Sequence, residues 1–111
     1  MESKIEVNGL LDCYGGLLTE KQQEICRYYY RDDLSYQEIA EITGTSRTAV
    51  YDTVKRCRQD LHHYEKILQI HALSEKRMNL YKQMKSLSTD ERMNRLIDEC
   101  ENTENEGGDY E

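Results

Sequence analysis

The stretch SYQEIAEITGTSRTAVYDTVKRCRQDL, residues 35–61, decides the fold of this chain. Ser35 followed three residues later by Glu38 is a capping-box pattern, so a helix is expected to begin at Tyr36. Gly44 comes directly after the apolar part of that helix, where a residue in the left-handed conformation ends a helix at little cost. The first half of the stretch therefore predicts a short helix that is closed by a glycine.

The second half of the stretch predicts a longer helix that begins at Arg47, with Ser46 as its N-cap. Its apolar residues recur at steps of four and three, which is typical of one buried helix face. They are Val50, Val54, Cys57 and Leu61. The buried side of the shorter helix is expected from Ile39, Ala40 and Ile42. Two helices joined by a glycine-containing turn form a helix-turn-helix motif, whose second helix is the recognition helix in DNA-binding proteins.

The composition of the chain favours helix almost everywhere. Its 111 residues include no Pro, Trp or Phe, only six Gly, and nine Tyr that supply all the aromatic mass. No run of β-branched residues alternates with a period of two. We therefore expect an all-α fold with no sheet and no membrane span. The N-terminus has no apolar leader, which predicts a cytoplasmic protein.

The net charge of −7 conceals an uneven distribution along the chain. Residues 98–111 hold seven acidic side chains and no basic one, and residues 1–44 hold nine acidic and four basic ones. Residues 45–85 reverse this balance, with nine basic and four acidic side chains. A positive segment centred on the second helix is what a nucleic-acid contact needs, although it also fits an ordinary solvated helix face.

Seven residues at the start and on the outer face of this helix are the candidates for nucleic-acid contacts. They are Ser46, Arg47, Thr48, Tyr51, Lys55, Arg56 and Arg58. Ser46 and the free backbone N–H groups beside it are placed to hold a phosphate, and the longer side chains are placed to reach bases or phosphates. Asp52 counts against this interpretation, because a carboxylate on or near the same arc repels phosphate.

The N-terminal part predicts two further helices. The first covers residues 4–14, with Ile5, Leu10, Leu11 and Tyr14 at helical spacings. The second covers residues 19–33 and begins with another capping box, formed by Thr19 and Gln22. Its run of three tyrosines cannot all face the core, so at least one phenol is expected at the surface or in an interface.

The apolar repeat of the long helix continues beyond residue 61, which predicts a helix from Arg47 to about Ile70. The heptad positions are Val50, Val54, Leu61, Tyr64 and Leu68. Two interpretations remain open. The heptad positions pair two chains in a homodimer, or residues further along the same chain cover them. The second interpretation uses Leu73, Leu80, Met84 and Leu87.

The C-terminal part predicts a bend near His71–Ser74, with Ser74 as a cap, a helix over residues 72–87 and a last short helix that starts near Ser88–Glu91. The inward side of the last helix is expected from Met93, Leu96, Ile97 and Cys100. This pattern divides the chain into three parts. They are a helix-turn-helix domain (1–70), a helical extension (71–101) and an acidic tail (102–111) that is too apolar-poor to fold.

No catalytic or metal-binding pattern is present. The four cysteines are far apart and form no CxxC pair or zinc-finger spacing with histidine. They are Cys13, Cys26, Cys57 and Cys100. His62 and His63 are neighbours on one helix and point in different directions, and the chain has no glycine-rich phosphate loop. We expect no enzymatic activity, no cofactor, no metal and no small-molecule substrate.

Residues 17–68, LLTEKQQEICRYYYRDDLSYQEIAEITGTSRTAVYDTVKRCRQDLHHYEKIL, resemble the YlxM family of small bacterial proteins. The specific motifs are LTEKQ, YYxxDxLSxxEIAE and SRTAVYD followed by a lysine-arginine pair, and the extension LxxYEKxL marks the group more narrowly. Thr45 departs from the Val or Ile more usual before the Ser-Arg pair. The resemblance implies a fold similar to the region-four domain of sigma factors. Such a fold is a winged-helix-type domain of three or four helices without a sheet, here extended by a long helix and C-terminal helices.

The resemblance also implies a function. Genes of this family lie beside those of the signal recognition particle (SRP) GTPase and its receptor, so members are thought to act in or regulate that protein-targeting pathway. The implied function is a regulatory or adaptor protein whose helix-turn-helix contacts the particle's RNA or its GTPase subunit. The alternative is a DNA-binding transcriptional regulator of the sigma region-four-like type.

Overall fold

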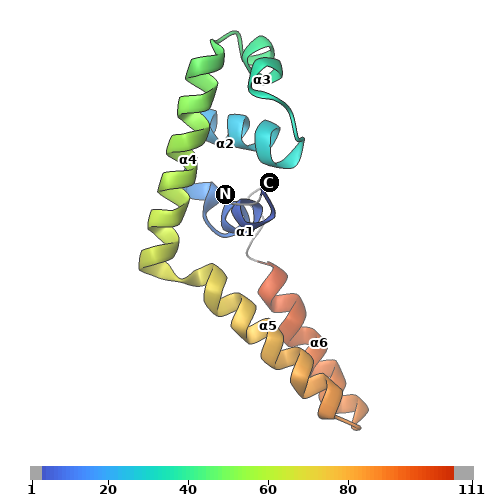
Figure 1. Cartoon of the computed structure of the whole chain (residues 1–111). Coiled ribbons are helices and arrows are strands. Elements are labelled where there is room, and N and C mark those ends of the chain that lie inside the picture. Colours follow the sequence, from blue (N-terminus) through green and yellow to red (C-terminus); the bar gives the residue numbers. More distant parts are fainter. Residues whose placement is uncertain (1–3, 107–111) are drawn as a thin grey trace.

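The computed structural model describes residues 4–106 and consists of helices joined by short turns in that range, with no strand in it, which confirms the all-α prediction. The elements in chain order are α1 (Lys4–Tyr14), η1 (Gly15–Leu17), α2 (Glu20–Cys26), η2 (Arg27–Arg31), α3 (Tyr36–Thr43), α4 (Arg47–Leu68), α5 (Ile70–Leu87) and α6 (Glu91–Glu106). Helices α1, α2 and α3 pack along one side of α4, and α5 and α6 form a hairpin that leads away from its C-terminal end (Figure 1).

The helix-turn-helix motif forms where the capping residues predict it. The Ser35 hydroxyl accepts the backbone N–H of Glu38 at 3.1 Å, and the Glu38 carboxylate accepts the N–H of Ser35 at 3.0 Å. Gly44 ends α3 at φ +69°, in the left-handed region that glycine adopts freely. Ser46 then caps α4 by accepting the N–H of Ala49 at 3.0 Å. The local signals therefore fix both helices and the turn between them.

The core lies between α4 and the three shorter helices. Its buried side chains are Val7, Leu10, Leu11, Tyr14, Leu18, Ile25, Cys26, Tyr30, Ile39, Ala40, Val50, Val54, Cys57 and Leu61. This set confirms the predicted buried face of α4. Two predicted core residues lie outside it, since Ile42 is 55% exposed and Ile5 is 84% exposed. In each case neighbouring residues of the same helix fill the side that faces α4.

The helix predicted over residues 19–33 changes form halfway. The Thr19–Gln22 capping box is present, and the α-helix ends at Cys26. The chain then widens into one π-helical turn, η2, closed by the N–H of Asp32 donating to the carbonyl of Arg27 at 3.1 Å. The tyrosine run lies in this wide turn, with Tyr30 buried and its two neighbours half-buried.

A sharp bend separates α4 from α5 at Gln69, which has φ +55°. Side chains from two helices accept the first N–H groups of α5. The Glu65 carboxylate accepts the N–H groups of His71 at 3.1 Å and Ala72 at 2.9 Å. The phenol oxygen of Tyr14 accepts the N–H of Ile70 at 2.9 Å and donates to Glu65 at 2.5 Å. The orphan donors of the new helix are therefore satisfied by α1 and α4 together.

The structure corrects several boundaries in the C-terminal part. Helix α4 ends at Leu68, and the bend falls at Gln69 instead of 71–74, so Ser74 lies inside α5 and does not cap it. Helix α6 continues to Glu106, so residues 102–106 are helical and not disordered. This occurs because Glu104 is held by contacts to α5. The rest of the predicted tail, 107–111, lies outside the described residues.

The predicted dimer seam along α4 is also corrected. Val50, Val54 and Leu61 are buried in the chain's own core, and Tyr64 packs against that core. Leu68 is about half exposed. All but Leu68 are covered by the chain's own core, so the seam offers no continuous surface to a second chain. The alternative cover, a return of α5 onto the seam, is not observed either, because α5 leads away from α4 (Figure 1).

In the last helix, only Ile97 of the four predicted inward residues is buried; Met93, Leu96 and Cys100 are exposed. Among residues 4–106, no helix combines the length and the apolar character needed to cross a membrane.

The contacts at the bend predict a measurable dependence of stability on Tyr14. Replacing Tyr14 with Phe leaves the N–H of Ile70 and one Glu65 oxygen without their partner, so we expect a loss of about 1–3 kcal/mol in the free energy of unfolding. Tyr64→Phe is the matched control, because the Tyr64 hydroxyl makes no hydrogen bond within the described residues. Urea unfolding followed by circular dichroism measures the free energy of unfolding of each variant. Equal losses for Tyr14→Phe and Tyr64→Phe would contradict the role given to Tyr14.

The same contacts predict a pH dependence. Partial burial raises the pKa of Glu65, but hydrogen bonds from Tyr14 and from the N–H groups of Ala72 and His71 outweigh it and hold the pKa below its usual value. A lowered pKa stabilises the fold above the unfolded-state value near 4.5 and ceases to do so as the pH falls through the folded-state value. The stability advantage of the wild type over Glu65→Gln should therefore shrink in acid. An advantage that stays constant from pH 6 to pH 3 would contradict this prediction.

Candidate nucleic-acid interface

The first half of α4 presents most of the predicted contact residues to solvent. Exposed members are Ser46, Arg47, Thr48, Tyr51, Lys55 and Arg56. Val50, Val54 and Cys57 hold the opposite side of this helix in the core, which fixes the direction in which the exposed side chains point. Arg47 and Lys55 form no ion pair with another described residue, so both charges are available to a ligand. The exposed arc of α4 is therefore polar, with two free positive charges.

The start of α4 is suited to an anion. Ser46 uses its hydroxyl to cap the N–H of Ala49, while the N–H groups of Arg47 and Thr48 precede the first intrahelical hydrogen bond. The positive end of the helix dipole adds to the Arg47 charge at this point. A phosphate placed here would meet two backbone donors and one guanidinium, as predicted for this terminus.

Tyr51 is supported by a ladder of tyrosines. Its ring lies edge-on to Tyr36 at 5.6 Å, and Tyr36 stacks on Tyr29 at 4.9 Å with an interplanar angle of 11°. The Lys4 ammonium sits 4.2 Å above the Tyr29 ring. Tyr51 is thus half exposed and held in place, so α3 and η2 position a side chain of the exposed arc. The tyrosine run in the sequence was the signal for this ladder, but spacing alone did not identify its partners.

Arg58 does not join the exposed arc. It is half-buried beside Tyr30, whose pKa is raised by burial while the neighbouring guanidinium opposes that shift. The contact between Arg58 and Tyr30 therefore joins α4 to η2. The structure therefore separates Arg58 from the other predicted contact residues.

Arg56 lies at the other edge of the arc and is partly neutralised. Its Nε donates to Asp60 at 3.3 Å, and Asp60 also accepts from Gln22 of α2 at 3.4 Å. Asp52 and Arg56 line a shallow hollow between α4 and the start of α2. The negative charge of Asp52 therefore belongs to the face that carries Lys55, as the sequence predicts, and it weakens the attraction of that face for phosphate.

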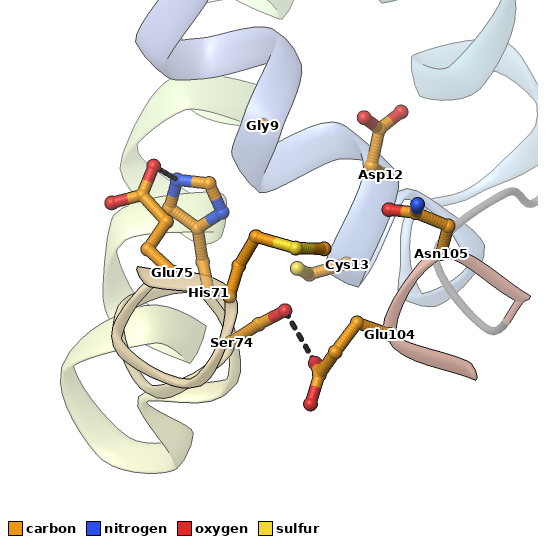
Figure 2. A pocket seen from close by; sticks show the side chains of 9 residues that line it. Gly9, Asp12, Cys13, His71, Ser74, Glu75, Glu104 and Asn105 are labelled. Atoms are coloured by element: carbon orange, nitrogen blue, oxygen red, sulfur yellow. Dashed lines mark hydrogen bonds and ion pairs between the residues drawn. The ribbon is translucent and has the colours of Figure 1, made fainter. Parts of the chain in front are cut away.

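A second hollow lies beside the bend and contains His71, Cys13 and Glu104 (Figure 2). His71 contacts Glu75 at 3.2 Å, and Ser74 donates to Glu104 at 2.6 Å. Within residues 4–106 no group of three His, Cys, Asp or Glu side chains is arranged to hold a metal ion. His71 and Glu75 pair within α5, and the bond from Ser74 to Glu104 joins α5 to α6, so this hollow lies where α1, α5 and α6 meet.

The fold and the exposed arc of α4 define a helix-turn-helix protein. A family model described as "helix-turn-helix protein, YlxM / p13 like", UPF0122, matches residues 1–100. A UPF0122 protein of Clostridium perfringens is 42% identical over 104 residues, covering 89% of this chain and 93% of that protein. A second relative, from Clostridium kluyveri, is 49% identical over 87 residues, covering 78% and 76%. The chain belongs to the UPF0122 family, and the predicted resemblance to YlxM proteins is confirmed.

The close approach of α1 to α5 beside the second hollow predicts an unusual response to alanine. A Cβ at Gly9 would lie 2.5 Å from Cε1 of His71, so the imidazole must move away. Glycine in a helix normally costs about 1 kcal/mol relative to alanine. We therefore expect Gly9→Ala to stabilise the His71→Ala background by about that amount and to give a smaller gain, or a loss, in the wild type. Equal effects in the two backgrounds, measured by urea unfolding, would show that the two residues do not interact.

Proposed function

We propose that this protein is a non-enzymatic regulatory protein that contacts nucleic acid through the first half of α4. The observation that carries the proposal is the exposed arc of that helix. It combines an uncovered helix N-terminus, two unpaired positive charges on Arg47 and Lys55, and a positioned aromatic ring on Tyr51. Phosphate contacts of this kind supply most of the affinity of nucleic-acid-binding proteins and depend on salt.

We further propose that the nucleic acid or protein contacted belongs to the signal recognition particle, either its RNA or its GTPase subunit. The support is the YlxM resemblance, whose gene neighbourhood implies that pathway. Asp52 on the contact face and the surplus of acidic residues in 1–44 are consistent with a target other than long duplex DNA, because both lower non-specific attraction to phosphate. In this role the protein is an adaptor and acts in the cytoplasm.

A DNA-binding transcriptional regulator is the second candidate, and the geometry of the motif favours it. As the second helix of the motif, α4 would take the place of the recognition helix in the major groove, and α3 packs against it. In that role Thr48, Tyr51 and Lys55 would face base edges. The two candidates share one contact surface and differ in the ligand, so a direct comparison of ligands separates them.

The experiment titrates one protein preparation against random duplex DNA, the particle's RNA and its GTPase subunit, at low and moderate salt. Tight binding to a particle component, with weak and salt-sensitive duplex binding, supports the adaptor. Preferential duplex binding supports the transcriptional regulator. Absence of binding to all nucleic acids at low salt, where phosphate contacts are strongest, would overturn the nucleic-acid proposal.

Removing positive charge from the exposed arc should lower the affinity of the protein for the nucleic acid that it binds. For Arg47→Ala with Lys55→Ala, loss of two phosphate contacts should reduce the slope of log affinity against log salt by about 1.8 on duplex or about 1.4 on a single strand. Arg92→Ala, at the start of α6, removes a positive charge far from α4 and serves as the control. An unchanged slope in the double variant would place the contact surface elsewhere.

Asp52→Asn should act in the opposite direction. It keeps the side-chain size and removes the carboxylate that opposes phosphate on this face, so we expect tighter binding at low salt and a smaller gain at high salt. Glu99→Gln, on α6, makes the same chemical change away from α4 and controls for net charge. Equal gains from the two variants would show that net charge, and not the position of Asp52, limits binding.

A further inference from the structure

The α5–α6 hairpin buries only one of its side chains completely. Across these helices of 18 and 16 residues, Ile97 is the single fully buried side chain, whereas the helix-turn-helix part of the described chain buries fourteen. Helices in proteins gain most of their stability by packing an apolar face against another element. The hairpin therefore leaves apolar surface that a further partner could cover.

Most large apolar residues of α5 stay exposed, on one flank of the side that contacts α6. They are Ile70, Leu73, Leu80, Met84 and Leu87. With Arg77 between Leu73 and Leu80, they follow alternating steps of three and four, the spacing of a helix that packs along one side against another helix. Their exposed fractions run from 44% to 84%.

Helix α6 carries a matching row on the same side of the hairpin. Met93, Leu96 and Cys100 are exposed and follow steps of three and four. Leu96 and Cys100 line one hollow together with Tyr81 of α5. Arg77, which lies within the α5 row, reaches across to Glu104 of α6 on this side. The two rows therefore form one continuous apolar face, which we call the outer face of the hairpin.

Polar contacts hold the two helices together instead. Glu104 accepts hydrogen bonds from Ser74, Arg77 and Tyr81, and Lys85 pairs with Asp98. The pairing of α5 with α6 is thus specified mainly by charge and hydrogen bonding. The large apolar side chains lie instead on the outer face, where another apolar surface can pack against them.

The distribution of charge over the hairpin indicates which partner is complementary to the outer face. Helix α5 carries four basic side chains and one acidic one, and α6 carries six acidic and two basic ones. Arg77 and Lys85 already pair with α6 within the hairpin. The charges that remain without an ion-pair partner among the described residues are still mainly basic on α5 (Lys76, Lys82) and mainly acidic on α6 (Glu91, Glu99, Glu106). A second copy whose two-fold axis runs parallel to the hairpin places α5 of each chain over α6 of the other, so opposite charges meet. An axis perpendicular to the helices places α5 over α5 and α6 over α6, so like charges meet. The hairpin is therefore complementary to itself in one orientation.

We propose that two copies of this chain associate through the outer faces of their α5–α6 hairpins to form an antiparallel-paired four-helix bundle, with the two-fold axis parallel to the hairpins. The interface is isologous, as in most homodimers. Because the axis runs along the hairpins, both helix-turn-helix modules lie at the same end of the assembly. The dimer surface differs from the α4 seam that the heptad pattern predicts, and it goes beyond the proposed function because it concerns assembly alone.

The first test is mass in solution by light scattering. The wild type should have twice the 13.2 kDa mass of the chain. Leu80→Glu places a charge in the centre of the outer face and should weaken self-association by at least about 100-fold. Because Leu80 is already about half exposed in the single chain, the variant should keep the wild-type circular dichroism spectrum. Asn79→Glu adds the same charge to a neighbouring exposed position off the face and should remain dimeric.

The second test fixes the orientation. Thr89→Cys marks the tip of the hairpin, in a background where Cys13 is changed to serine and Cys100, which lies on the outer face, to alanine, and whose mass in solution is first shown to be that of the wild type. With the axis parallel to the hairpins the two tips meet, and a short bismaleimide should link them. With a perpendicular axis the tips lie at opposite ends, roughly one helix length of 27 Å apart. Adding Leu80→Glu should abolish the cross-link.

Three outcomes would overturn the proposal. They are a wild type that stays monomeric at high micromolar concentration, a dimer that is indifferent to Leu80→Glu, and a dimer broken by Leu80→Glu whose tips do not cross-link. The first two remove the outer face as an interface between copies. The third removes the charge-matched orientation.

Discussion

The backbone donors at the start of α5 set the arrangement of the whole molecule. A helix that begins immediately after another ends has N–H groups with no intrahelical partner, and burying them unpaired is costly. Tyr14 and Glu65 accept these groups and bond to each other, so one cluster ties α1, α4 and α5 together. Burial and the bond to Glu65 raise the pKa of Tyr14 to about 12, which keeps the phenol neutral and able to donate over the ordinary pH range.

Local chemistry explains which features were predictable from the sequence. Capping boxes, the left-handed glycine and the apolar period of α4 act within a few residues, and each of them formed where expected. The bend at Gln69 was misplaced because one of the two side chains that accept the first N–H groups of α5 is Tyr14, more than fifty residues away in sequence. The end of α6 was misplaced for a related reason. In the sequence Glu104 belongs to an acidic, apolar-poor segment, and its partners Ser74 and Arg77 on α5 are distant in sequence.

The exposed arc of α4 likewise has features that could be predicted from the sequence and features that could not. Exposure of Arg47, Lys55 and Tyr51 followed from the helical period, since the buried positions of α4 fix the opposite side. Arg58 lies four residues after Val54 and three before Leu61, so the same period places it at the edge of the buried side. Its neighbour Tyr30 could not be predicted in this way, because it lies in the π-helical turn and no pattern of apolar spacing revealed where the extra residue of that turn would be accommodated.

The left-handed Gln69 has a consequence for the reach of the molecule. It is the only residue between α4 and α5, and α5 extends for 18 residues, roughly 27 Å at 1.5 Å per residue. A change of about 10° in one backbone torsion there displaces the far end of the hairpin by about 5 Å relative to α4. The bonds of Tyr14 and Glu65 to the first N–H groups of α5 hold this angle, so a substitution at position 69 that shifts the torsion would break them and move the far end of the hairpin relative to α4.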